Sequence, residues 1–362
     1  MARMILNETS YFGAGCRREV VGEMNRRNMK KAFIVSDKDL VRFGVAKKVT
    51  DVLDEAGIAY EMFDDVKANP TIANVKNGLA AFEKANADVI IAIGGGSVMD
   101  TAKAIGIITE NPEFADVKSL EGTADTKHKS FPIIAFATTS GTAAEVTINY
   151  VITDEEAGRK LVCVDPNDIP MIAFNDAEML MSMPKGLTAA TGMDALTHAI
   201  EAYITPGATP LSDLLTWNSI KFIAENLEAA VKDGSNAAAR EGMAYGSYVA
   251  GMAFSNVGLG IVHSMAHPLG ARYDIAHGVA NALLLPYVME YNKPAACKKF
   301  GDIARAMGVD IKGMTEEEAA DAAIEAVRKL SKAIGIPQKL HELGIKEEQL
   351  KQLSEDAFID PC

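Results

Sequence analysis

Short apolar segments alternate with amphipathic ones through the first half of the chain, and this alternation limits the possible folds more than any other feature. Short segments typical of strands lie at residues 31–36, 59–65, 88–97 and 130–139. Runs with helical spacing of apolar residues lie between them, at 39–57 and 72–87. Strands that alternate with helices in this way pair in parallel, so the pattern predicts a parallel sheet covered by helices. Residues 152–165 instead predict a hairpin that turns near Gly158.

The second half has a different periodicity. Strand-like segments disappear after about Asp176, and from Pro184 onward nearly every segment has helical spacing. Helices are predicted at 184–204, 210–232, 236–256, within 262–292 and at 315–334. A chain of 362 residues is long enough for two domains. We therefore expect an α/β domain over residues 1–183 and an all-helical domain over residues 184–362.

The net charge and the cysteines indicate which binding partners and which cell compartment to expect. The net charge of −13 disfavours binding to a nucleic acid backbone. The four cysteines are too far apart in sequence for a paired zinc motif, and a chain of this length needs no disulfide scaffold, so reduced thiols in a cytosol fit best. The N-terminal residues show no apolar signal segment, and charges interrupt each long apolar run. We expect a cytoplasmic protein with no membrane or nucleic acid partner.

Two polar loops follow predicted strands and point to a nucleotide. Residues 91–106 read as a strand, three glycines and a helix. The glycines allow close backbone approach, Ser97 can cap the helix, and the helix N-terminus can bind a phosphate. Residues 136–145 add hydroxyls that can hold a pyrophosphate and its ribose. The alternatives are a tight turn without a ligand and a Ser/Thr-rich turn. The loop residues are Gly94, Gly95, Gly96 and Ser97, then Thr138, Thr139 and Thr142.

Asp37 lies directly after the first predicted strand. A carboxylate at this place can bind a ribose diol and would repel a 2′-phosphate, which favours NAD over NADP. However, Asp37 precedes the glycine loop, whereas the acidic residue of the usual dinucleotide fingerprint follows it. From the residues alone, a helix cap is the better interpretation of Asp37.

A divalent metal site is predicted from two separate segments. Asp194 and His198 lie four residues apart, so they share one face of a predicted helix. His263, His267 and His277 fall within fifteen positions of one another. Imidazole nitrogens with one carboxylate suit iron, zinc or copper. The five candidate residues are one more than a four-ligand metal site needs, and the extra imidazole could transfer a proton during a hydroxyl oxidation. The alternative is a set of structural histidines.

His128 and His341 lie in polar surroundings, and we expect both at the surface.

These segments resemble the iron-dependent (group III) alcohol dehydrogenases. The resemblance is carried by GGGSxxD, by TTSGTAAEVT, by the GMDALTHAIE helix and by HSMAHPLGARY with HGVANALLLPYVM, and it runs from ILNET to the last residues. The two-part metal motif is highly specific, whereas GGGS is shared with glycerol dehydrogenases and dehydroquinate synthases. The resemblance implies a dehydroquinate synthase-like fold, in which an N-terminal α/β dinucleotide-binding domain precedes a helical metal-binding domain.

The same resemblance implies roles for individual residues. Fe(II) would bind Asp194, His198, His263 and His277, with His267 as the catalytic residue beside the nicotinamide. NAD would contact Asp37, Asn69, Gly94, Gly95, Gly96, Ser97, Asp100, Thr138, Thr139, Thr142, Val151, Lys160 and Leu187. The substrate pocket would include Asn149, Phe254 and Cys362. The resemblance also implies a homodimer, and similar proteins continue past the position of Cys362 with a turn and a final helix.

The resulting expectation is a dehydrogenase that depends on Fe(II) and NAD(H) and interconverts a small aldehyde and its alcohol. Within the family, the resemblance favours the branch that acts on lactaldehyde and 1,2-propanediol, with 1,3-propanediol or butanol oxidation as the alternative. Zn(II) would suit the ligands at least as well as iron. More distant alternatives are an NAD-dependent cyclising lyase and an NAD-binding protein without activity. The lyase would need a cluster of basic residues near the metal, where only Lys185 and Arg272 stand out.

Overall fold

The computed structural model describes residues 3–360 and 362. It contains two compact units, which we call the α/β unit and the helical unit. The α/β unit comprises Met4–Thr139 and Ala143–Ser182. The helical unit comprises Ser140–Thr142 and Met183–Cys362, with Arg3. The domain ranges expected from the sequence also include residues 1, 2 and 361, which lie outside the described residues.

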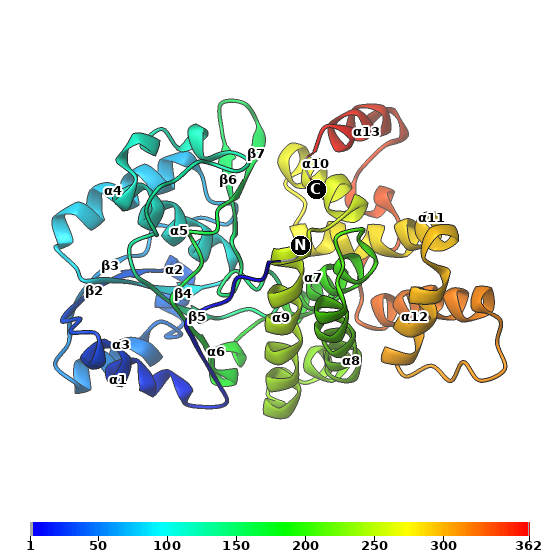
Figure 1. The fold of residues 1–362 in the computed structure, drawn as a ribbon, viewed down its shortest axis with the longest axis horizontal. Helices are drawn as coiled ribbons and strands as arrows, with labels where there is room; N and C mark the ends of the chain where they lie inside the picture. Colours follow the sequence, from blue (N-terminus) through cyan, green and yellow to red (C-terminus); the bar gives the residue numbers. More distant parts are fainter. Residues whose placement is uncertain (1–2, 361) are drawn as a thin grey trace. The chain divides into compact units, whose positions relative to one another are not determined.

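The α/β unit is built on a parallel sheet (Figure 1), as the alternating pattern predicts. The described residues give it six strands in the order β1-β8-β5-β4-β2-β3, all parallel. Their bounds are β1 Thr9–Phe12, β2 Lys31–Val35, β3 Ala59–Phe63, β4 Val89–Gly94, β5 Ile133–Ala137 and β8 Ile172–Asn175. Two of these strands, β1 and β8, were not predicted from the sequence.

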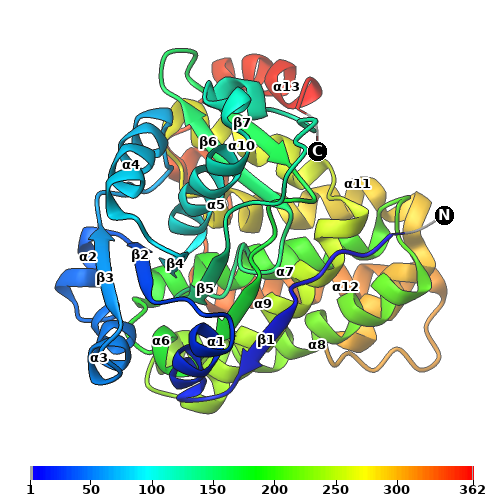
Figure 2. The same cartoon turned by 60° about the vertical axis from the view of Figure 1, so that its left-hand side comes forward.

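Successive strand residues point to opposite faces of this sheet, and helices cover both faces (Figure 2). Ile34 and Ile91 pack with α1 and α3 on one face, whereas Phe33 and Ile90 pack with α4 and α5 on the other. Burial on both faces explains why β4 is apolar along its whole length. The helices of this unit are α1 Val20–Arg26, α2 Lys38–Arg42, α3 Lys47–Glu55, α4 Ile72–Ala85, α5 Gly96–Glu110 and α6 Ala177–Leu180.

Residues 39–57 form two helices rather than the single one predicted. The chain leaves α2 at Phe43, and Gly44 adopts a positive φ of 75° before α3 begins. Glycine takes this left-handed conformation without steric cost, so it ends the first helix.

The predicted hairpin is present and is longer than expected. It pairs β6 (Asn149–Asp154) with β7 (Arg159–Val164). A buried lysine ties this hairpin to α5, because Lys103 Nζ donates to the carbonyls of Thr147 at 2.6 Å and Asn149 at 2.9 Å.

Among the described residues, the secondary structure of the helical unit is entirely helical. Helix α7 is its centre and contacts α8, α9 and α11. Gly192 permits the close approach of α7 and α8, since a Cβ atom there would lie 2.2 Å from Leu227 Cδ1. The bounds are α7 Lys185–Ile204, α8 Pro210–Lys232, α9 Ala237–Val257, α10 Ile261–Tyr273, α11 His277–Ala306, α12 Glu316–Ala333 and α13 Leu350–Phe358.

The Pro-Leu-Gly sequence at 268–270 does not break the helix that carries His263 and His267. It lies inside α10, which ends later, where Asp274 takes a left-handed conformation. Helix α11 then runs well beyond the predicted 292, with a non-helical residue at Ala296. The described part of α13 was not predicted.

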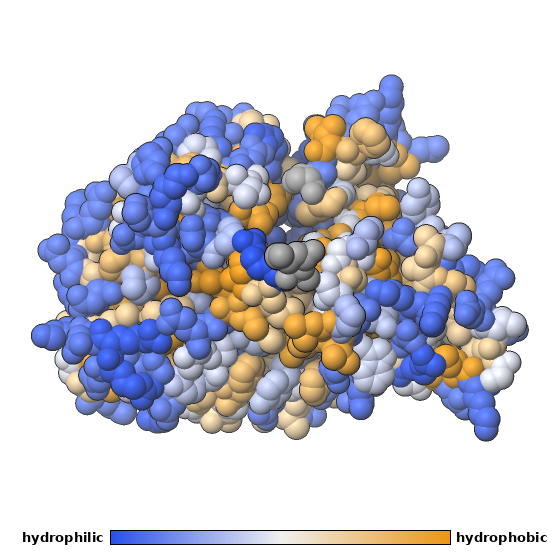
Figure 3. Space-filling model, viewed as in Figure 1, coloured by the Kyte–Doolittle hydropathy of each residue, from blue (hydrophilic) through white to orange (hydrophobic). Residues whose placement is uncertain are grey.

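Among the described residues, no single helix is long and apolar enough to cross a bilayer. Helices α9 and α10 satisfy the length and composition criteria only as a pair bent by 103°. On the face shown in Figure 3, hydrophilic residues predominate over α1, α3 and α4. His128 and His341 are exposed, as predicted.

Candidate active site

One buried face of α7 carries three polar side chains. Asp194, His198 and Glu201 are each no more than 4% exposed. Their spacing of four and then three residues places them in successive turns on the same side of the helix. The sequence therefore presents two candidate ligands and a further carboxylate in a region that is otherwise core.

Helices α10 and α11 supply the remaining candidates. His263 and His267 lie one turn apart on α10, and His277 is the first residue of α11. Gly278 lets α11 approach α7, because a Cβ atom there would lie 2.3 Å from the carbonyl oxygen of Ala190. The close contact brings His277 Nε2 to 3.6 Å from Asp194 Oδ1.

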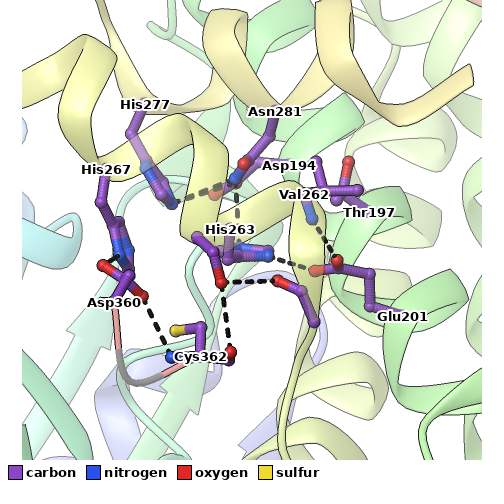
Figure 4. A network of polar contacts seen from close by, with 12 residues as sticks. Asp194, Thr197, Glu201, Val262, His263, His267, His277, Asn281, Asp360 and Cys362 are labelled. Carbon is purple, nitrogen blue, oxygen red and sulfur yellow. Dashed lines mark hydrogen bonds and ion pairs between the residues drawn. The ribbon is translucent and has the colours of Figure 1, made fainter. Parts of the chain in front are cut away.

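The structure brings together four of the five predicted metal candidates. One potential ligand atom from each of Asp194, His198, His263 and His277 lies within 4.8 Å of the others. Figure 4 shows Asp194, His263 and His277 facing a common region. The rings of His198 and His263 stack at a centroid distance of 4.6 Å.

Burial keeps two of these imidazoles neutral. It lowers the pKa of His198 to about 4 and that of His263 to about 3, despite the opposing attraction of Asp194. A neutral imidazole has a lone pair free for a cation, so both rings are in the form that binds metal near neutral pH.

Two residues that the sequence analysis did not assign also belong to this site. Asn281 lies one turn after His277, and its Nδ2 is 2.7 Å from Asp194 Oδ1 and 3.1 Å from the Nε2 atoms of both His263 and His277. Glu201 contacts His263 Nδ1 through Oε2 at 2.5 Å. Burial raises the pKa of Glu201 to about 7, against the hydrogen bond from the Val262 amide. The sequence signals that could have identified them are helical spacings: Glu201 lies seven residues after Asp194, and Asn281 lies four residues after His277.

The chemistry of this donor set fits a divalent cation. A single amide group with two hydrogens cannot donate to the three acceptor atoms that face Asn281 Nδ2. In the described part of the chain, His198 Nδ1 is buried without a hydrogen-bond partner. Three imidazoles and one carboxylate are a common ligand set for iron or zinc.

His267 belongs to a second group of residues. Its Nδ1 lies 2.8 Å from Asp360 Oδ2, and Cys362 lies close to both. Burial alone would raise the pKa of Asp360, but the hydrogen bond from His267 lowers it below its ordinary value. The ring of His267 stacks against His277 at a centroid distance of 5.5 Å, which places His267 directly beside the four-residue cluster.

The predicted substrate residues are distributed over both units. Phe254 is buried in the helical unit, and its ring stacks on His198 at a centroid distance of 4.2 Å. Cys362 belongs to the same unit, where its backbone carbonyl accepts from Ser264 Oγ at 3.1 Å. Asn149 belongs to the α/β unit.

The glycine loop lies where the strand order reverses. From β2 the chain goes to β3 on one side and later to β4 on the other, so the switch point lies between β2 and β4. Asp37 follows β2 and Gly95–Ser97 follow β4, at the carboxyl edge where nucleotides bind in parallel α/β sheets. The helix cap is Gly95 rather than the predicted Ser97. A Cβ atom on Gly95 would lie 3.0 Å from Thr139, so any larger residue at this position would crowd the second polar loop.

Other predicted cofactor residues form contacts within the α/β unit. Asp37 caps α2 by accepting from the Leu40 amide at 2.8 Å, as the alternative interpretation predicted. Lys160 Nζ donates to Asn69 Oδ1 at 3.1 Å. Burial raises the pKa of Asp100 to about 7, although Lys103 and the Val151 amide favour its charged form. Of the remaining predicted cofactor residues, Gly94, Thr138 and Thr139 lie in this unit, and Thr142 and Leu187 lie in the helical unit.

Comparisons with known proteins cover nearly the whole chain. The family "Iron-containing alcohol dehydrogenase" matches residues 7–177, and "Fe-containing alcohol dehydrogenase family, C-terminal" matches residues 188–362. The chain is 57% identical to lactaldehyde reductase of Escherichia coli (strain K12) over 360 residues, covering 99% of this chain and 94% of the relative.

Solved structures agree with this assignment. A 1,3-propanediol oxidoreductase superposes with a TM-score of 0.97 at 44% identity, covering 100% of this chain and 94% of that one. Sulfoacetaldehyde reductase from Bifidobacterium kashiwanohense in complex with NAD+ gives a TM-score of 0.88 at 30% identity, covering 100% and 93%. These matches confirm the predicted fold class and enzyme class. The chain belongs to the iron-containing alcohol dehydrogenase family and is an oxidoreductase that interconverts alcohols and aldehydes.

Proposed function

We propose that the protein uses Fe(II) and NAD(H) to interconvert lactaldehyde and 1,2-propanediol. The observation that carries the proposal is the convergence of Asp194, His198, His263 and His277, whose candidate ligand atoms lie within 4.8 Å of one another. The lactaldehyde reductase relative supports the choice of substrate. Family membership supports iron over zinc, because the ligands themselves suit both metals.

In this proposal, residues 184–362 hold the metal and the reacting groups. Asp194, His198, His263 and His277 bind the cation, which when bound supplies Lewis acidity toward a carbonyl oxygen. The proposed substrate contacts are Phe254 and Cys362 of the helical unit and Asn149 of the α/β unit. Burial of Phe254 against His198 keeps that imidazole in one orientation and excludes water from its ring face.

Residues 1–183 bind most of the cofactor, whose reduced nicotinamide supplies the hydride. The amides at the start of α5 hold the pyrophosphate, and Asp37 selects the unphosphorylated ribose and hence NAD. The proposed contacts are Asp37, Asn69, Gly94, Gly95, Gly96, Ser97, Asp100, Thr138, Thr139, Val151 and Lys160, together with Thr142 and Leu187 of the helical unit.

His267 supplies the proton in this proposal. Reduction adds a hydride to the carbonyl carbon and a proton to the oxygen, so a proton donor is needed near the substrate. Asp360 holds Nδ1 of His267 at 2.8 Å and fixes the ring, leaving Nε2 to exchange the proton.

The proposal includes a homodimer in the cytoplasm, with no nucleic acid or membrane partner. The net charge of −13 supports the absence of a nucleic acid partner, and the family resemblance supports the dimer. Light scattering of the purified protein tests the oligomeric state, and a monomer would contradict this part.

The decisive test is metal removal and replacement. Protein stripped of metal and refilled anaerobically with Fe(II) should regain NADH oxidation with lactaldehyde, and NADPH should be a much poorer cofactor. Recovery with zinc alone would contradict the iron assignment. No turnover of any short aldehyde by iron-loaded protein would contradict the function.

The similarity to a 1,3-propanediol oxidoreductase favours a second substrate within the same chemistry. Comparing kcat/KM for 1,2-propanediol and 1,3-propanediol with NAD distinguishes the two. A higher kcat/KM for 1,3-propanediol would make 1,3-propanediol the proposed substrate in place of 1,2-propanediol.

A further inference from the structure

Glu201 is a buried carboxylate that directly contacts one of the proposed metal ligands. We infer that Glu201 is a positioning residue, which fixes the proton of His263 on Nδ1 and thereby presents Nε2 to the cation. The inference rests on the proposed metal site.

The two carboxylate oxygens of Glu201 have separate partners. Oε1 accepts from the backbone amide of Val262 at 2.7 Å, and Oε2 lies 2.5 Å from His263 Nδ1 (Figure 4). Glu201 is 3% exposed, and a Cβ atom on Gly260 would lie 3.1 Å from Oε1. The carboxylate therefore sits in a closely packed, dry position between α7 and the start of α10.

The first contact anchors the helix that carries His263. Helix α10 begins after Gly260, which has no side chain that could cap it. The first amides of a helix need acceptors, and a negative charge is favourable at this end. Glu201 supplies such an acceptor from α7, so the start of α10, and with it His263, is tied to the helix that carries Asp194 and His198.

The second contact determines which nitrogen of His263 is free. A neutral imidazole carries one N–H, and the other nitrogen has the lone pair. His263 Nε2 lies 3.1 Å from Asn281 Nδ2, on the side of the candidate ligand cluster. A carboxylate acceptor at Nδ1 holds the proton there and leaves Nε2 available, which is the arrangement typical of metal-bound histidines.

Glu201→Gln separates the two roles at nearly constant volume. The Val262 amide can only donate, so the amide oxygen of Gln would stay on Val262 and its NH₂ group would face His263 Nδ1. Nδ1 would then have to accept, and the proton would move to Nε2. The helix anchor is kept, whereas the nitrogen that faces the cluster loses its lone pair.

We expect Glu201→Gln to weaken zinc binding by about 10- to 100-fold, the usual effect of removing the partner of a metal-bound histidine. Zinc is the probe because it is diamagnetic, and chelator competition gives its dissociation constant. Nitrogen-15 NMR of the metal-free protein reports the tautomer directly, with the proton on Nδ1 in the wild type and on Nε2 in the variant.

Glu23→Gln is the matched control. Glu23 is a buried glutamate of the α/β unit that accepts hydrogen bonds from Tyr11 and Arg26. Its substitution should lower the free energy of unfolding and leave the zinc dissociation constant unchanged.

The outcomes separate this inference from the proposed function. If the wild type binds no zinc at the cluster, the proposed metal site is wrong. If the wild type binds zinc and Glu201→Gln binds it equally well, the role of Glu201 is wrong. Should the variant not fold, the wild-type spectrum still decides, since an Nε2–H tautomer in metal-free wild type would overturn the inference.

Discussion

Phe254 should control how strongly the helical unit binds metal, although it offers no ligand atom. Its ring lies on that of His198 at a centroid distance of 4.2 Å and an interplanar angle of 12°, and His263 stacks on His198 at 4.6 Å. His198 Nδ1 is buried without a hydrogen-bond partner among the described residues, so ring packing contributes to the orientation of this imidazole, together with the Gly141 backbone and Asp194 nearby.

The magnitude follows from these contacts. Phe254→Leu keeps most of the buried volume but removes the ring stack, which contributes about 0.5–1.5 kcal/mol to the free energy of unfolding. A freed imidazole must be ordered again when metal binds, at a cost of about 0.5–1.5 kcal/mol, so the zinc dissociation constant should rise about two- to tenfold. Phe254→Ala should lower the free energy of unfolding by about 3–5 kcal/mol through the cavity it leaves.

Chelator competition and urea unfolding of the metal-free protein measure the two quantities separately. Phe222→Leu is the control, because Phe222 stacks on Tyr245 at 6.0 Å within the same unit and contacts no proposed ligand. A Phe254→Leu variant that unfolds more easily yet binds zinc as tightly as the wild type would refute the reasoning that ring packing orients His198.

Three further predictions concern other contacts. Gly278→Ala places a Cβ atom 2.3 Å from the Ala190 carbonyl oxygen, so urea unfolding should show a loss of about 1–3 kcal/mol, and an unchanged midpoint would count against this contact. Gly95→Ala crowds Thr139 at 3.0 Å, and fluorescence titration should show about tenfold weaker NADH binding with unaltered zinc affinity. Burial raises the pKa of Glu145 from 4.5 to about 7, so its contribution to stability is complete below pH 4.5 and is lost as pH rises through 7. Glu145→Gln should therefore unfold at higher urea than the wild type at pH 8, by on the order of 3 kcal/mol, with no difference at pH 4.

The convergence of Asp194, His198, His263 and His277 was predictable because the sequence signals for it are local. A spacing of four residues places Asp194 and His198 on one helix face, and three histidines within fifteen positions are too dense for chance placement. Strand β4 was predictable for a similar reason, because a short apolar run that ends in glycines is typical of a buried strand.

The remaining features depend on contacts between distant segments. His267 shares a face with His263, but its Nδ1 contacts Asp360, a residue far away in the sequence, so it lies beside the four-residue cluster and not in it. The spacing 194–201 places Glu201 on the same face of α7 as Asp194, but its contacts with Val262 and His263 depend on where α10 begins relative to α7. Strand β1 has only four partly buried residues, so only its partner β8 identifies it as a strand.

The pairing of β1 with β8 affects the order in which the strands of the sheet can pair during translation. Just before β1, the Asn7 side chain donates to the Pro170 carbonyl, 163 positions further along the chain. Strand β1 therefore stays unpaired until β8 has been translated, when nearly half of the polypeptide has been made. The strands that lie between β1 and β8 in the sequence can already associate by then. Contacts of such long sequence separation form slowly, so we expect β1 to close the edge of the sheet only after the strands between β1 and β8 have paired.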